Sequence, residues 1–207
     1  MIESQVRPNG ITDRRIILAM SRLPREDFVP ESCRAVAYMD EDVPLGVAGR
    51  HLIEPMALAR LVQLAEVKPG EKVLDVGAAT GYGAAVLVDL AGHVVALEQD
   101  PQLVASAREN LQGHSAVKVV EGKLDAGCAS ESPFDVIVIE GRVSDVPEEL
   151  LQQLAPGGRL VAIIGETEMA RARVHTSTAK GLAVRDAFDA TVSALPGFEK
   201  KRPAFVF

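Results

Sequence analysis

The chain has 207 residues, of which 47% are hydrophobic and 25% charged, and 29 acidic against 22 basic residues give a net charge of −7. This length and composition are typical of a single globular domain that buries a continuous core without disulfide or metal staples. The acidic balance argues against a nucleic-acid partner, which needs clustered Lys and Arg. No stretch approaches the roughly 18 consecutive apolar residues of a membrane span.

The cysteines and the N-terminal segment bear on the compartment. Cys33 and Cys128 match no metal or redox spacing, so we expect two small buried hydrophobes and no metal site. The first ten residues, MIESQVRPNG, are polar and lack the apolar core of a secretion signal. A cytoplasmic protein without membrane attachment is therefore expected, and its oligomeric state stays open.

The first third of the chain is expected to be helical with a loop-rich insertion. Thr12 or Asp13 caps a helix whose apolar residues recur at helical spacing, and Pro24 ends it. Residues 24–55 form the loop-rich part, after which Pro55 suits the first turn of a second helix.

From Lys72 onward, short apolar runs alternate with helical segments. The runs cover residues 72–77, 93–98, 117–122, 134–141 and 159–165, and the helices cover 82–91, 101–111 and 147–154. Continuous apolar strands alternating with helices predict a mostly parallel, doubly wound α/β sheet. The remaining tail predicts an antiparallel strand pair around Lys180 and Gly181.

The most informative segment is KVLDVGAATGYGAAVLVDLAG, in which a strand runs into a glycine-rich turn and a helix. Gly77 and Gly81 allow a tight turn and close approach of a ligand at the carboxyl edge of the sheet. Asp75 ends this strand, and Glu98 ends the next one, 98 − 75 = 23 positions later. A carboxylate there can accept both ribose hydroxyls, so the pair predicts a nucleoside without phosphates.

A dinucleotide site is the competing interpretation. Such sites use G-x-G-x-x-G and hold a pyrophosphate at the helix N-terminus, whereas the glycines here are Gly77, Gly81 and Gly83. Asp75 would also lie close to the pyrophosphate, while it can orient a cationic amino group. A glycine-rich turn that binds nothing is the other alternative, and Asp75 and Glu98 together argue against it.

The chain also resembles the protein-L-isoaspartate O-methyltransferase family over nearly its whole length. The resemblance lies in PREDFVP, AYMDEDVPLG, DVGAATGYGAAVL, VVALEQD, PFDVIVIEG and LLQQLAPGGRLVAIIG. It implies a Rossmann-like methyltransferase fold with an N-terminal helical addition, S-adenosylmethionine as methyl donor, and isoaspartyl residues of damaged proteins as acceptors. A protein or peptide is thus the implied partner.

The resemblance also implies which residues bind the donor. Asp75, Gly77, Gly81 and Glu98 match cofactor positions, and Ala79 stands where the family usually has glycine. Gln99 is expected at the edge of the adenine pocket. The further implied cofactor residues are Leu52, Tyr82, Lys123 and Leu124.

The acceptor segment departs from the family pattern. Where the family has G-Q-T-I-S-Q-P, this chain has Gly49-Arg50-His51-Leu52-Ile53-Glu54-Pro55. Ile53 takes the place of the serine, and Arg50, His51 and Glu54 are the other candidate catalytic residues. Arg50 or His51 can hold an anionic acceptor, Glu54 would repel a carboxylate if it faces inward, and a plain polar loop is the alternative.

Two further motifs differ. The family's G-D-G becomes Gly122-Lys123-Leu124, and lysine has no acceptor for an adenine amino group, although Asp125 is near. Small residues after the fourth strand become Glu140-Gly141-Arg142.

The chain is expected to be one methyltransferase domain, residues 1–207, with an acceptor-loop region (1–66) and a cofactor-binding core (67–207). Three functions remain open: an isoaspartyl methyltransferase with a modified acceptor site, a methyltransferase for another acceptor, and a donor-binding protein without activity.

Overall fold

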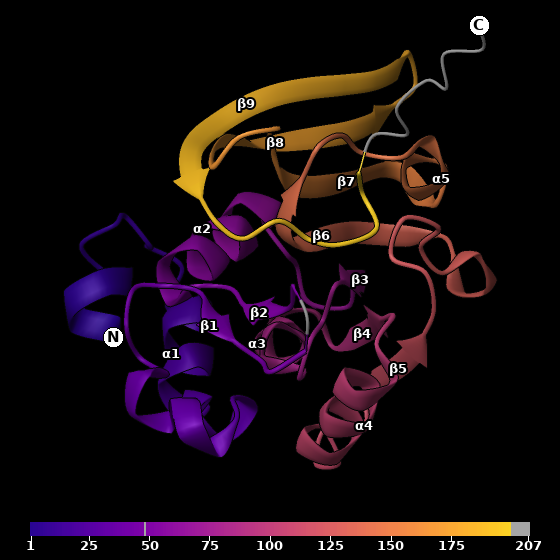
Figure 1. The fold of residues 1–207 in the computed structure, drawn as a ribbon. Helices are drawn as coiled ribbons and strands as arrows, with labels where there is room; N and C mark the ends of the chain where they lie inside the picture. The colour runs from indigo at the N-terminus through magenta and orange to yellow at the C-terminus, as the bar shows by residue number, and fades with distance from the viewer. Residues whose placement is uncertain (48, 200–207) are drawn as a thin grey trace, which may run out of the picture.

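The computed structural model describes residues 1–47 and 49–199, and a seven-stranded sheet forms its centre (Figure 1). The strand order is β5-β4-β3-β6-β7-β8-β9. The first five strands are parallel, and β8 and β9 are antiparallel, which confirms both predictions for the sheet. The strands are β3 (Lys72–Val76), β4 (His93–Glu98), β5 (Val117–Glu121), β6 (Phe134–Val143), β7 (Leu154–Ile164), β8 (Met169–Thr178) and β9 (Gly181–Thr191).

The helices follow the expected order, and one of them is shorter than expected. The α-helices are α1 (Arg14–Arg22), α2 (Pro55–Ala65), α3 (Tyr82–Ala91), α4 (Pro101–Asn110) and α5 (Glu148–Leu151). Shorter turns are η1 (Ile2–Val6), η2 (Arg25–Phe28), η3 (Glu31–Val36) and η4 (Ala129–Glu131). The prediction of a helix over 147–154 was wrong in length, because Leu154 already pairs with Phe134 in the sheet.

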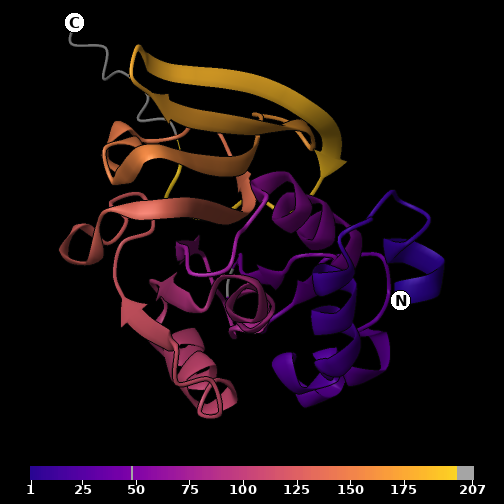
Figure 2. The same ribbon diagram turned by 180° about the vertical axis from the view of Figure 1, so that it is seen from behind.

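Alternating side chains of the central strands supply two separate cores, since successive residues of a strand point to opposite faces. Val73 and Val136 face the core that carries α1, α2, α3 and α4. Leu74 and Ile137 face a smaller core with Leu150 of α5. The two faces of the sheet are therefore covered unequally. The face that carries α1, α2, α3 and α4 has the thicker helical layer, and this layer includes the N-terminal addition (Figure 2).

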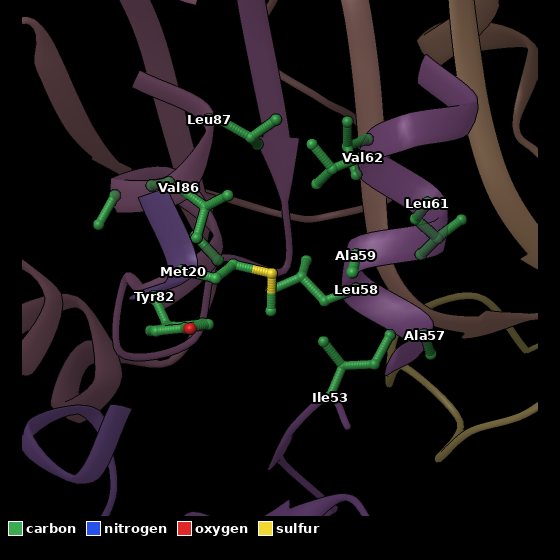
Figure 3. Packing of buried hydrophobic residues seen from close by; sticks show 14 of the residues in the cluster. Met20, Ile53, Ala57, Leu58, Ala59, Leu61, Val62, Tyr82, Val86 and Leu87 are labelled. Carbon is green, nitrogen blue, oxygen red and sulfur yellow. The ribbon is translucent and has the colours of Figure 1, made fainter. Parts of the chain in front are cut away.

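The N-terminal addition is attached to the core by polar and apolar contacts. Asp13 caps α1 by accepting from the Arg15 N–H, and the Gln63 side chain of α2 bonds the backbone at Thr12 and Gly10. Met20 of α1 belongs to the same apolar cluster as the side chains of α2 and α3 (Figure 3).

A two-stranded hairpin, β1 (Val43–Pro44) with β2 (His51–Leu52), follows η3. It carries the segment in which the family motif is altered. After β9, a segment that we call the strap (residues 192–198) crosses the end of the sheet (Figure 1). Arg142 of β6 fixes the strap by exchanging backbone hydrogen bonds with Ser193 and Leu195.

No helix in the described part of the chain is long and apolar enough to cross a membrane.

Candidate active site

The candidate site lies where β3 and β6 run side by side and their connections leave in opposite directions. Asp75 of β3 is paired in register with Val138, and Glu140 follows on β6. Ligands of open α/β sheets bind at such a switch point, outside the carboxyl ends of the strands. The register of β6 with β7 shifts after Val138, and this irregularity places Glu140 at the site.

Glu98 at the end of β4 is fully buried and accepts four hydrogen bonds. One oxygen accepts from the Gln99 and Asp100 N–H groups at 2.8 and 3.1 Å. The other accepts from the Ala79 N–H at 2.9 Å and from Nη2 of Arg50 at 2.5 Å. The predicted ribose acceptor is therefore at the sheet edge, with a cation already bound to it.

A cavity of about 520 Å³, within the range of small-ligand sites, opens beside Glu98, and Arg50 and Gln99 form its wall there because Glu98 itself is fully buried. Its lining includes Arg50, Gln99, Asp100, Glu121 and Lys123. Gln99 and Lys123 thus lie where the resemblance places an adenine pocket. Sequence reasoning missed Asp100 and Glu121, whose carboxylates can accept from an adenine amino group although Lys123 cannot.

Leu124 and Leu52, two other implied cofactor residues, lie elsewhere. Both are fully buried, Leu124 in the smaller core and Leu52 in the larger one. Their side chains support the loops that carry the site.

Asp75 and Glu140 form a buried pair of carboxyl groups. Burial raises the pKa of Asp75 to about 7, and the charge of Glu98 adds to this shift. Burial also raises the pKa of Glu140 well above its usual value, and Asp75 raises it further. Two carboxyl groups this close cannot both ionise in a dry site, so Glu140 carries the proton. Apart from Glu140, neither oxygen of Asp75 has a hydrogen-bond partner in the described ranges 1–47 and 49–199.

The glycine turn has the backbone that the sequence predicts. Gly77 and Gly81 have φ values of 80° and 96°, which favour glycine, and Ala79 adopts φ 52°. The Ala79 conformation directs its N–H at Glu98. Leu195 of the strap packs on this turn, because a methyl carbon built on Gly77 would lie 2.9 Å from it.

Side chains of the acceptor segment (residues 49–55) lie partly in the larger core and partly along a small cavity. Ile53, at the place of the family serine, is buried in the larger core beside α2 (Figure 3). Ile53, Arg50, His51 and Glu140 line a cavity of about 10 Å³. Nδ1 of His51 is buried and has no hydrogen-bond partner in the described part.

Glu54 lies on the other side of this segment. Burial raises its pKa to about 7, and the charges of Asp40 and Asp42 add to the shift. The Glu54 carboxyl lines a cavity of about 420 Å³ with Arg60 and Phe188, between α2 and β9. Asp42 accepts from the Glu54 N–H at 2.7 Å and from Ser193 of the strap at 2.5 Å.

Arg25 is a site residue that sequence reasoning did not single out. It is fully buried, donates to the carbonyls of Ala37 and Ile53 at 2.7 and 2.6 Å, and lies 4.8 Å from the ring centre of Tyr82. Tyr82, an implied cofactor residue, is also fully buried and packs edge-on against Phe28. Arg25 and Phe28 both belong to PREDFVP, so that motif could have pointed to this anchor of the acceptor segment.

These residues fit an adenosyl donor with a cationic amino-acid end. The cavity beside Glu98 has room for a nucleoside, and the Asp75 oxygens suit a cation. Arg50 contacts Glu98, and Leu195 packs on Gly77 of the glycine turn.

Comparison with known proteins agrees with this geometry. The family model of protein-L-isoaspartate(D-aspartate) O-methyltransferase matches residues 1–192. A protein-L-isoaspartate O-methyltransferase of Koribacter versatilis is 40% identical over 171 residues, 82% of this chain and 77% of that protein. One from Aeropyrum pernix is 38% identical over 202 residues, 95% of this chain and 77% of the relative.

Solved structures resemble the fold. One protein-L-isoaspartate O-methyltransferase has a TM-score of 0.80 at 25% identity, over 93% of this chain and 64% of that one. A Plasmodium falciparum structure, described as a complex of such an enzyme with S-adenosyl-L-homocysteine, has a TM-score of 0.76 at 22% identity, over 92% of this chain and 94% of its own. With the family model matching nearly the whole chain, this protein belongs to the protein-L-isoaspartate(D-aspartate) O-methyltransferase family.

Proposed function

We propose that this chain is an S-adenosylmethionine-dependent methyltransferase that esterifies the free carboxylate of isoaspartyl residues in proteins. The observation that carries the proposal is the cavity beside Glu98, together with the buried carboxyl group of Asp75 near the end of the adjoining strand, whose one partner among the described residues is Glu140. Family membership supports the donor and the acceptor.

In this proposal Glu98 accepts a hydrogen bond from the ribose, and Gln99, Asp100 and Glu121 surround the adenine. Gly77, Ala79 and Gly81 shape the turn on which the donor lies. Asp75 takes the amino group of the donor, which offsets the cost of a buried carboxylate. When bound, S-adenosylmethionine supplies an electrophilic methyl group on a sulfonium.

The acceptor needs no general base, because a carboxyl group with a pKa near 4 is already ionised at pH 7. The protein therefore contributes mainly alignment and exclusion of water. Arg50 and His51 are the proposed acceptor-binding residues, and Ile53 supplies an apolar wall where the family has a hydroxyl. Losing that hydrogen bond to a charged acceptor costs about 1.5–3 kcal/mol, roughly tenfold to 150-fold in rate.

We further propose one domain, in which residues 1–66 carry the acceptor loop and residues 67–207 the donor site, because side chains from both parts share the larger core. A cytoplasmic location stays a prediction.

The test measures transfer of labelled methyl from S-adenosylmethionine to an isoaspartyl peptide and to the same peptide with aspartate. Asp75→Asn should lower donor affinity at least tenfold, since it removes a charge from the amino-group site. Asp135→Asn is the matched control, because Asp135 bonds the backbone of Lys72 at the opposite end of the sheet. Donor binding without transfer to the isoaspartyl peptide would reject the acceptor, and methylation of another acceptor would replace it.

A further inference from the structure

All acceptor sites of the Glu98 carboxylate are occupied by hydrogen bonds from the protein itself. A carboxylate has about four lone-pair sites, and Glu98 accepts four hydrogen bonds. A ribose hydroxyl therefore cannot bind until a present donor leaves, and each donor that leaves frees one acceptor site.

Three of the four donors are backbone groups with fixed positions. Gln99 and Asp100 lie in the turn into α4, where the Asp100 side chain caps the helix through the Gln102 and Leu103 N–H groups. Ala79 lies in the turn before α3. These N–H groups hold the carboxylate in place, and they cannot leave it unless the turns before α3 and α4 change their backbone conformation.

Arg50 is the donor that can leave. Its side chain makes two hydrogen bonds, one to Glu98 and one to the Gly77 carbonyl at 3.2 Å, and within the described residues its Nε has no partner. Its backbone is fixed separately, through bonds with Leu45 and Val47. The guanidinium can therefore rotate away without moving the hairpin.

Arg50 also lies close to a second place where its guanidinium can bind. It lines both the 520 Å³ cavity and the small cavity that contains His51 and Ile53. A guanidinium released from Glu98 thus lies next to the acceptor segment, where it can bind a carboxylate bidentately.

We propose that Arg50 exchanges partners: the nucleoside of the donor displaces it from Glu98, and the freed guanidinium binds the carboxylate of the acceptor. The exchange rests on the proposed function for the identity of both ligands. It makes binding ordered, with donor before acceptor, and the coupling must act in both directions.

The first test is calorimetry with S-adenosyl-L-homocysteine, which needs no turnover. Arg50→Met leaves Glu98 free for the ribose, so affinity should rise at least tenfold over the wild type. Arg50→Lys keeps the positive charge but lacks the planar guanidinium with its paired donors. Its affinity for S-adenosyl-L-homocysteine should lie between those of the wild type and Arg50→Met. Melting temperatures establish that each variant is folded.

Arg159→Met is the matched control, since Arg159 also forms a partly buried ion pair, with Glu71 at 2.8 Å, remote from the cavity. It should lose stability and bind S-adenosyl-L-homocysteine as the wild type does. Unchanged or weaker affinity in Arg50→Met would overturn the exchange.

The second test measures anisotropy of a labelled isoaspartyl peptide with and without S-adenosyl-L-homocysteine. The wild type should bind the peptide at least tenfold more tightly with the nucleoside present, and Arg50→Met should show no such gain. Equal peptide affinity in both conditions would overturn the transfer of Arg50 to the acceptor.

The outcomes separate the two proposals. Tighter nucleoside binding in Arg50→Met, together with no methylation of the peptide by the wild type, keeps the displacement and rejects the isoaspartyl acceptor. Equal binding of the nucleoside by both proteins, with methylation, rejects the exchange and keeps the function. Absence of nucleoside binding in both proteins rejects both proposals.

Discussion

The carboxyl group of Glu140 fills the space that a side chain on Gly83 would need. A methyl carbon built on Gly83 would lie 1.4 Å from Oε1 of Glu140. Gly83 is in the first turn of α3, which has no side-chain cap, and free N–H groups at a helix start favour a carboxyl group. Substitutions at Gly83 and Glu140 are therefore expected to have coupled effects on the free energy of unfolding.

Gly83→Ala is expected to destabilise the protein by about 1–3 kcal/mol, because the carboxyl group must leave a packed site. In a Glu140→Ala background the same change should be neutral or stabilising by up to about 1 kcal/mol, since alanine is the better helix former. Urea unfolding of the four proteins measures this cycle. An equal cost in both backgrounds would contradict the pairing.

The buried pair of Asp75 and Glu140 predicts an unusual dependence of stability on pH. Both pKa values are raised by burial, so the native state keeps protons that the unfolded chain releases near pH 4. Stability should therefore fall as pH rises from about 4 toward 7, by up to about 1.4 kcal/mol per pH unit for each extra proton held.

Glu140→Gln should flatten this fall and give a protein more stable than the wild type at pH 8, as measured by denaturant unfolding. Glu71→Gln is the control with the opposite sign: burial alone would raise the pKa of Glu71, but hydrogen bonds from Arg159 and from the Lys68 N–H outweigh it and leave that pKa lowered. It should destabilise the protein at neutral pH. A wild-type stability that rises steadily from pH 5 to 8 would contradict the role of the carboxyl pair.

Much of the fold could be predicted because local patterns determined it. Asp13 caps α1 and Pro55 opens α2 as expected, and apolar runs became the parallel strands. The helix expected over 147–154 shows the limit of such patterns. Pairing of Leu154 with Phe134 decided where α5 ends, and no local signal reports that contact.

The same limit applies to the candidate site. Asp75 and Glu98 could be placed at the sheet edge, because each is one of the last two residues of a parallel strand. The contact of Arg50 with Glu98 spans 48 positions, and that of Leu195 with Gly77 joins the strap to the first turn. These contacts depend on the paths of the hairpin and the strap, which the sequence pattern left undefined.

Arg25 is expected to be a structural anchor of the acceptor segment. Arg25→Met removes two hydrogen bonds from a buried charge to the carbonyls of Ala37 and Ile53, at about 1.5–3 kcal/mol each. A loss of about 3 kcal/mol or more in unfolding free energy is expected, with a higher KM for the peptide. Arg22→Met, at an exposed position on α1, should change stability by less than about 0.5 kcal/mol. Equal stability of Arg25→Met and Arg22→Met would exclude a structural role of Arg25 as the anchor of the acceptor segment.

Glu54 predicts how methyl transfer should depend on pH. Burial and the charges of Asp40 and Asp42 raise its pKa to about 7, so it is neutral below that pH and charged above it. The ionised group would repel an acceptor carboxylate bound at the adjoining segment. A repulsion of about 1 kcal/mol corresponds to an approximately fivefold fall in kcat/KM for an isoaspartyl peptide as pH rises through 7.

Two substitutions identify the group responsible for this fall. Glu54→Gln should keep the low-pH value of kcat/KM at pH 8, because the amide does not ionise. Asp40→Asn should move the fall to lower pH, since removing that charge lets the pKa of Glu54 decrease. A profile that is the same in the wild type and both variants would mean that the charge of Glu54, in the cavity between α2 and β9, does not act on the acceptor.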